Sequence, residues 1–248
     1  MDDKYIIIND KTIRNAIEKI EKNTKGFVFV VNHSNELVGI ITDGDIRRGL
    51  LNGLNLDNCV VDVMSYSFAY ISETSSFEEV ITLFQSPKIN VLPIVNGNKE
   101  LTNFITKKHL HIMLMSDYNF DLSFNFDSLD EMILEYEVYN RPWGMYKTTF
   151  QNQYSKSKII IVLANESLSL QEHKKRDEHW VIIKGKGLLT IGESQKNVYG
   201  GDYIYIPKGC KHRIENSGDE TLLITEVQLG DYFGEDDIIR YSDNYGRK

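Results

Sequence analysis

The sequence predicts two domains: an α+β domain built from a repeated unit, followed by an all-β antiparallel barrel. Three observations lead to this prediction. Residues 12–46 and 76–110 form an internal repeat. From Val138 onward, glycines separate short apolar strands at regular intervals, which is typical of an antiparallel barrel. Among those strands lie two spaced motifs, at 171–178 and 201–216, that carry imidazole, carboxylate and amide side chains.

Both copies of the repeat show the same order of elements. Apolar residues at helical spacing open the first copy and align, without gaps, with an equivalent set in the second. The strand predicted at 27–31 aligns with 91–95, and the strand at 37–41 aligns with 101–105. Each copy should therefore run helix, strand, strand, short helix. One copy alone could hardly cover its own sheet, so we expect the two copies to pack face to face.

The end of the second strand in the first copy carries a recognisable stretch, GIITDGDIRR at residues 39–48. With the repeat, it resembles a tandem pair of CBS domains (a Bateman module), which often binds adenine nucleotides. The resemblance implies that Thr42 contacts the phosphate and Asp45 the ribose, roles that suit a hydroxyl at a helix start and a carboxylate. Simple helix capping explains the same two residues equally well. The second copy keeps Thr106 but has His109 in place of the aspartate.

Residues 116–137 are predicted to form a linker that is rich in acidic and aromatic residues and contains no Lys or Arg. Its apolar side chains argue against a free chain, and we expect it to pack on a domain or on a second subunit. The predicted boundaries are therefore 1–115 for the repeated pair, 116–137 for the linker and 138–248 for the barrel.

The two motifs in the predicted barrel have the residue types of a metal site. The first is Gln171-x-His173-x4-Glu178, and the second places His212 after a turn that contains Pro and Gly. Gln171 and His173 are two residues apart, so on a strand both face the same side. Neutral imidazoles, one carboxylate and an amide oxygen suit a borderline divalent ion. We predict these four side chains as ligands, with Zn2+ as the first choice and another divalent metal as the alternative.

Both motifs resemble those of cupins, which are double-stranded β-helix barrels with a metal inside. Many cupins have His at the position of Gln171 and Gly at the position of Asn165. Phosphomannose isomerases carry Gln-x-His there. Further stretches match that family: RPWG at 141–144, RDEHW at 176–180, EVQ at 226–228, GEDDIIR at 234–240 and YGR at 245–247. Residues 137–248 thus resemble the type II mannose-6-phosphate isomerase domain, usually found behind a mannose-1-phosphate guanylyltransferase.

The resemblance implies a metal-dependent aldose–ketose isomerase that interconverts mannose-6-phosphate and fructose-6-phosphate. Adenine nucleotide at the CBS pair would regulate it, and it would supply precursors of GDP-mannose and surface polysaccharide. Basic residues cluster beside both motifs and would attract a sugar phosphate. For Arg240, a salt bridge to Asp236 or Asp237 is the alternative. We expect five side chains to act: Arg176, Lys175 and Glu226 in catalysis, and Arg240 and Lys211 in substrate binding.

Two other functions stay open on the sequence. A non-catalytic cupin could sense a sugar phosphate or a nucleotide and keep the barrel as a binding module. A metal-dependent cupin oxygenase is disfavoured, because a Gln ligand differs from the two-His, one-carboxylate set of the iron enzymes. The N-terminal region shows no Gly-rich nucleotidyltransferase signature, so we do not expect this chain to make GDP-mannose.

Charge, apolar runs and cysteine content indicate where in the cell the protein acts and what it binds. The net charge is −8, and an acidic protein without a strong basic face is a poor nucleic-acid binder. No apolar run approaches the roughly 20 residues needed to span a bilayer, and no signal peptide is recognisable. Cys59 and Cys210 fall in different predicted domains, which fits a reducing cytoplasm. We expect a cytoplasmic homodimer that binds a sugar phosphate and an adenine nucleotide, and neither nucleic acid nor membrane.

Overall fold

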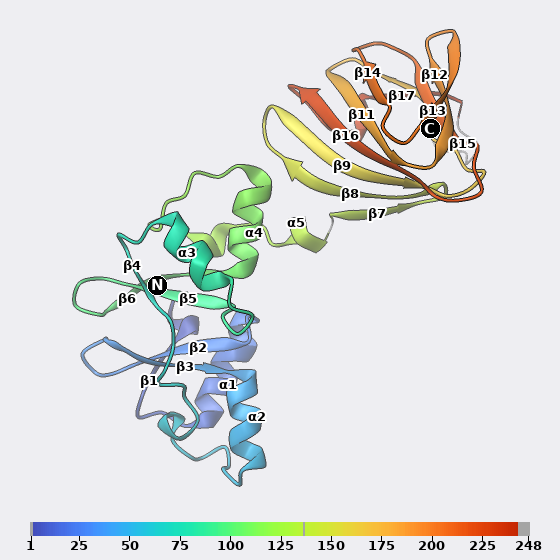
Figure 1. The fold of residues 1–248 in the computed structure, drawn as a ribbon. Helices are drawn as coiled ribbons and strands as arrows, with labels where there is room; N and C mark the ends of the chain where they lie inside the picture. The colour runs from blue at the N-terminus through green and yellow to red at the C-terminus, as the bar shows by residue number, and fades with distance from the viewer. Residues whose placement is uncertain (1, 136, 243–248) are drawn as a thin grey trace. The chain divides into compact units, whose positions relative to one another are not determined.

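The computed structural model describes residues 2–135 and 137–242. The chain divides into two compact units, which are described separately (Figure 1). The first contains the residues up to 110 and 119–129, and the second contains 111–118 and the residues from 130 onward. The predicted YGR stretch at 245–247 lies outside the described residues. Among the described helices, none is both long enough and apolar enough to cross a membrane.

The first copy of the repeat forms a three-stranded sheet with two helices. β1 (Ile6–Ile8), β2 (Phe27–Val31) and β3 (Leu37–Thr42) lie in that order in the sheet. β1 pairs parallel with β2, and β2 pairs antiparallel with β3. The helices are α1 (Ile13–Asn23) and α2 (Asp43–Leu51), and each begins at a threonine cap where the sequence predicts a helix start.

The second copy repeats this order. β4 (Ile71–Ser72), β5 (Val91–Val95) and β6 (Leu101–Thr106) form the second three-stranded sheet, with parallel and antiparallel pairings as in the first. Its helices are α3 (Phe77–Phe84) and α4 (Lys107–Ser116), and the first turn of α4 belongs to this unit. The predicted internal repeat is therefore confirmed. Three short 3-10 helices complete the unit: η1 (Asp3–Tyr5), η2 (Val60–Asp62) and η3 (Phe126–Ser128).

An aromatic cluster joins the two copies. Phe27 and Phe29 of the first sheet and Phe104 of the second share one buried core with Tyr5. The ring centres of Tyr5 and Phe104 are 4.7 Å apart, and those of Phe27 and Phe104 are 5.5 Å apart. Each copy thus covers the apolar sheet face of the other, as expected for a face-to-face pair.

The second unit is a barrel of two antiparallel sheets, which confirms the predicted all-β cupin architecture (Figure 1). The strand order is β13-β12-β15-β10-β17 in one sheet and β14-β11-β16-β9-β8-β7 in the other. Between the sheets lies a core that includes Trp180, Leu189 and Ile224. The elements of the barrel and its approach are α5 (Met132–Glu135), β7 (Val138–Arg141), β8 (Gly144–Gln151), β9 (Ser155–Val162), β10 (Leu170–His173), β11 (Arg176–Lys184), β12 (Lys186–Ile191), β13 (Ser194–Tyr199), β14 (Tyr203–Ile206), β15 (His212–Asn216), β16 (Leu222–Gly230), η4 (Glu235–Asp237) and β17 (Ile238–Ser242).

Two asparagines shape loops at the barrel ends. Asn165, which replaces the glycine of many cupins, has a φ of 62°, a left-handed conformation that asparagine tolerates better than most residues. Asn216 is buried. Its amide nitrogen donates to the carbonyls of Val162 at 2.9 Å and Glu220 at 2.8 Å, and its amide oxygen accepts from the N–H of Gly218 at 2.9 Å. One side chain therefore satisfies three backbone groups.

Replacing Asn216 with alanine should lower the free energy of unfolding of the barrel by about 3 kcal/mol, because several backbone polar groups would lose their buried partner. Both tryptophans of the chain lie in the barrel, so tryptophan fluorescence during urea unfolding reports on this domain. Asn197→Ala, at an exposed position of β13, is the matched control and should change stability by less than about 0.5 kcal/mol. Equal effects of the two substitutions would contradict the assigned role of Asn216.

Candidate metal centre

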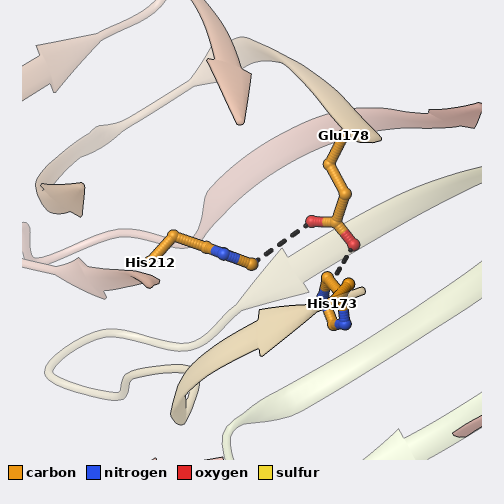
Figure 2. Close-up of side chains that lie close together, drawn as sticks. All are labelled: His173, Glu178 and His212. Carbon is orange, nitrogen blue, oxygen red and sulfur yellow. Dashed lines mark ion pairs between the residues drawn. The ribbon is translucent and has the colours of Figure 1, made fainter. Parts of the chain in front are cut away.

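Three side chains from three strands meet inside the barrel, as Figure 2 shows. His173 ends β10, Glu178 lies in β11, and His212 begins β15. The Oε1 atom of Glu178 is 3.0 Å from Nε2 of His173, and its Oε2 atom is 3.4 Å from Nε2 of His212. All three residues are buried, and their ligand atoms lie within 4.8 Å of one another. A single cation could therefore contact all three.

The turn between β10 and β11 brings the first two ligands together. The side chain of Asp237 accepts hydrogen bonds from the backbone N–H groups of Lys174 and Lys175, each at 3.2 Å. This fixed turn places His173 and Glu178 on facing strands. Alternation along β11 then directs Glu178 into the barrel, in phase with Trp180.

Strand pairing brings the third ligand to the same place. Gln171 of β10 lies opposite His212 of β15 in an antiparallel pair. The N–H of Gly209 also donates to the carbonyl of His173 at 2.6 Å, which ties the turn before β15 to the end of β10. Backbone hydrogen bonds thus bring together His173 and His212, which are 39 residues apart in the sequence.

The ring nitrogens are arranged as metal ligands are. Nδ1 of His212 is 3.0 Å from the carbonyl oxygen of Cys210. A carbonyl only accepts, so Nδ1 carries a proton, and in the neutral imidazole Nε2 is the atom left to bind a cation. Within the described residues, neither His173 Nε2 nor His212 Nε2 makes a well-directed hydrogen bond, although both atoms are buried. Two imidazoles and one carboxylate form a donor set known from catalytic zinc sites, so these residues fit a divalent cation.

Electrostatics keep the carboxylate ionised. Burial alone would raise the pKa of Glu178, but the close imidazoles of His173 and His212 hold that pKa well below its ordinary range. Burial would lower the pKa of His212, and its contact with Glu178 outweighs this and raises the pKa. A metal ligand must be deprotonated at the carboxylate, and Glu178 meets that requirement.

Gln171, the fourth predicted ligand, lines a cavity beside Glu178. Its Oε1 atom accepts a hydrogen bond from the hydroxyl of Ser169 at 3.0 Å. Its role as a ligand stays a prediction.

Neighbouring side chains orient the Glu178 carboxylate. Nε2 of Gln228 donates to Oε1 at 2.9 Å, and the indole N–H of Trp180 faces Oε2 at 3.2 Å. The Arg176 Nε atom lies 3.6 Å from Oε1. The sequence reasoning did not assign Gln228 or Trp180 to the site. Alternation along β16 was the available signal, since Gln228 is in phase with the buried Ile224.

The cavity beside Glu178 has a volume of about 50 Å3. Cations outnumber carboxylates in its lining by one, even without a metal ion. With a divalent cation bound, the lining would be strongly positive and would suit an anion. The charged residues of the lining are Arg141, Lys158, Arg176, Arg240, Glu178, Glu226 and Glu235.

Only some of the residues predicted to act on substrate line the cavity. Arg176, Glu226 and Arg240 line the cavity, whereas Lys175 and Lys211 do not. The Lys175 ammonium lies 4.4 Å from the centre of the Tyr232 ring, and the Lys211 ammonium lies 3.9 Å from the centre of the Tyr241 ring. Both lysines are exposed. Their roles in catalysis and substrate binding stay predictions.

Two acidic residues partner the arginines in a way that the sequence did not indicate. Arg240 pairs with Glu235 at 3.3 Å, rather than with Asp236 or Asp237. Asp237 pairs instead with Arg176, at 3.3 Å. Asp237 therefore holds both the β10–β11 turn and the buried arginine next to Glu178.

In the first unit, the predicted nucleotide residues form a helix cap. The Thr42 hydroxyl donates to the Asp45 carboxylate at 2.6 Å, and the Thr42 N–H donates to it at 2.8 Å. Asp45 also pairs with Arg48. In the second copy, the N–H of His109 donates to the Thr106 hydroxyl at 3.1 Å. The capping interpretation thus describes these contacts, and nucleotide binding by Thr42 and Asp45 stays a prediction.

A second buried carboxylate faces the cavity. Glu226 pairs with Lys158 at 3.1 Å, and the two side chains are only 4 % and 12 % exposed. Its other oxygen accepts from the indole N–H of Trp180 at 3.0 Å. Burial and the charge of Glu178 raise the pKa of Glu226, while Lys158 opposes this rise. Lys158 therefore neutralises a charge that the barrel would otherwise bury alone.

Comparison with known families identifies both parts of the chain. Residues 128–243 match the family described as mannose-6-phosphate isomerase C-terminal, and residues 1–52 and 60–115 match the CBS domain. A relative from Escherichia coli O157:H7, "Mannose-1-phosphate guanylyltransferase 2", is 44 % identical over 46 % of this chain and 24 % of its own length. "Xanthan biosynthesis protein XanB" of Xanthomonas campestris is 43 % identical over 43 % of this chain and 23 % of its own length. The chain thus spans about a quarter of the length of these relatives.

Solved structures that are similar to part of this chain include a Klebsiella pneumoniae protein described as having a double-stranded β-helix domain. It is 16 % identical, with a TM-score of 0.39, and the match covers 45 % of this chain and 95 % of that protein.

The relatives' names correct the activity predicted from the sequence. The Escherichia coli relative and a relative from Salmonella montevideo are named for guanylyl transfer to mannose 1-phosphate, so the predicted mannose-6-phosphate isomerase, an aldose–ketose isomerase, is wrong. The prediction failed because the motifs specify a fold and a ligand set, and neither of these fixes a reaction. The placement of the three buried ligands does not depend on that assignment.

Replacing Lys158 with methionine should lower the free energy of unfolding of the barrel by about 3 kcal/mol, because it leaves the Glu226 charge buried without a partner. The double variant Lys158→Met, Glu226→Gln removes that charge and should recover most of the loss. Lys196→Met, at an exposed position, controls for the loss of a lysine. Urea unfolding followed by tryptophan fluorescence measures all three. A double variant as unstable as Lys158→Met would show that the unpaired charge is not the cause.

Proposed function

Because this chain carries a CBS domain pair and a cupin-type domain of the mannose-6-phosphate isomerase C-terminal family, we propose that its barrel binds a divalent metal ion together with a phosphorylated mannose. Mannose 1-phosphate is the first candidate, since the relatives are named for it. The role would lie in supplying GDP-mannose for polysaccharide synthesis, in the cytoplasm. The observation that carries the proposal is a buried His–Glu–His cluster set beside four cationic side chains.

The charges around the site support a ligand that is both hydroxylated and anionic. A divalent cation held by two neutral imidazoles and one carboxylate keeps a net charge near +1, so it can still attract a sugar oxygen. Arg141 and Arg240 present planar guanidinium groups at the same cavity, and guanidinium groups match phosphate oxygens in geometry and charge. A hexose phosphate offers both kinds of group.

The proposal concerns binding by the barrel, and it does not extend to transfer of the guanylyl group. The residues described here supply a ligand set for a cation and a cluster of cations for an anion. An adenine nucleotide at Thr42 and Asp45 and a homodimeric assembly remain further parts of the proposal. The CBS match of residues 1–52 supports the nucleotide part.

Metal-free protein should bind about one zinc ion per barrel, as measured by isothermal titration calorimetry. Glu178→Gln keeps the shape of the side chain but removes the charge and one anionic ligand, so zinc affinity should fall at least about tenfold. Glu172→Gln is the matched control, because Glu172 lies on β10 between Gln171 and His173 with its side chain on the opposite face of that strand, and its affinity should match that of the unaltered protein. Equal zinc affinity in Glu178→Gln would contradict the proposed site.

Zinc-loaded protein should bind mannose 1-phosphate saturably, and removal of the metal should weaken that binding at least about tenfold, since metal and cations act on the same ligand. Mannose without phosphate should bind far more weakly than mannose 1-phosphate. Calorimetry with and without metal measures both effects. Affinity that is unchanged on removing the metal, or no binding at all, would rule out the proposed metal-dependent sugar site.

A further inference from the structure

One exposed carboxylate at the cavity is surrounded by cations. Oε2 of Glu235 is 3.3 Å from the Nη2 atom of Arg240, and Oε1 is 3.9 Å from the Nη2 atom of Arg141. The hydroxyl of Tyr146 donates to the same Oε1 at 3.4 Å. Partial burial raises the pKa of Glu235, but Lys158, Arg141 and Arg240 together hold it below its ordinary value. The carboxylate is therefore ionised, and it contacts the guanidinium groups of both Arg240 and Arg141.

The cationic side chains around Glu235 could bind more acceptor oxygens than its carboxylate supplies. The Arg240 side chain is 15 % exposed, yet its Nε atom has no hydrogen-bond partner within the described part of the chain. Arg141 lies over the ring of Tyr146, with 5.3 Å between its guanidinium carbon and the ring centre, and Lys158 lies 5.0 Å from the same centre. A phosphate would offer more acceptor oxygens and more charge than one carboxylate.

Glu235 is also in the lining of two cavities. The cavity at Glu178 measures about 50 Å3, which is room for a cation and a few water molecules, because one water molecule needs about 10–15 Å3 of such space. A neighbouring open cavity of about 510 Å3 shares three wall residues with it: Arg141, Tyr146 and Glu235. Glu235 and its two neighbours in the lining therefore border both cavities.

We propose that Arg141, Arg240 and Lys158 form a phosphate subsite, and that Glu235 occupies it until an incoming phosphate displaces the carboxylate. The displacement would free both guanidinium groups for the phosphate oxygens at the border between the two cavities. The inference deepens the proposed function, on which it rests for the identity of the sugar, by naming the groups that bind the phosphate.

The local fold allows Glu235 to move while its neighbours stay. Asp237, at the other end of η4, is buried and holds the β10–β11 turn through Lys174 and Lys175. The side chain of Glu235, in contrast, is 55 % exposed. A rotation about its side-chain bonds would release both arginines without disturbing the buried anchor.

The test uses inorganic phosphate and metal-free protein, measured by isothermal titration calorimetry. Glu235→Gln removes the competing charge and should bind phosphate about tenfold more tightly than the unaltered protein, because apparent affinity is reduced by the fraction of sites already occupied. Arg240→Met should abolish that gain in a double variant with Glu235→Gln. Asp236→Asn makes the same charge change in the same short helix, next to Tyr232 instead of the arginines, and should alter affinity less than about twofold.

Unchanged or weaker phosphate binding in Glu235→Gln would overturn the inference. An equal gain in Asp236→Asn would also overturn it, because the effect would then come from overall charge. The outcome is separable from that of the proposed function. If Glu235→Gln tightens phosphate binding but mannose 1-phosphate does not bind to the zinc-loaded protein, the subsite stands and the proposed sugar fails.

Discussion

The barrel depends on keeping an ionised carboxylate in its interior. Glu178 is 1 % exposed, and a charge at such a position is tolerated only when opposite charges and donors surround it. The chain meets this demand with groups from several strands. Histidines come from β10 and β15, an indole N–H from β11 and an amide from β16. The pairing of these strands is therefore inseparable from the chemistry of the site.

Much of the fold was predictable because periodicity and local caps act over short distances. The repeat showed itself through matching apolar positions, and Thr12 and Thr42 cap the helices that follow them. His173, Glu178 and His212 could be predicted because two spaced motifs carry ligand-type side chains, with alternation between Gln171 and His173 and a turn before His212. The structure brings these three together, while the cation itself remains a proposal.

What the sequence could not supply was the pairing of distant strands and the direction of turn residues. Lys158 reaches the cavity because β9 pairs with β16, which places it opposite Glu226. Lys175 and Lys211 stand next to ligands in the sequence yet face outward, because they lie in turns. Arg240 pairs with Glu235 and not with Asp236 or Asp237, although these two are nearer in the sequence. In η4, Asp236 contacts Tyr232 and Asp237 contacts Arg176 instead. The reaction could not be predicted either, because a ligand set is compatible with several uses of a sugar phosphate.

The central claim is that two imidazoles and one carboxylate hold a single cation inside the barrel. X-ray absorption at the zinc edge, on protein loaded with one equivalent of zinc, tests it most directly. The account predicts low coordination, with nitrogen and oxygen ligands at about 2.0–2.2 Å and the outer-shell scattering of imidazole rings. Coordination by oxygen atoms alone, without imidazole scattering, would contradict it.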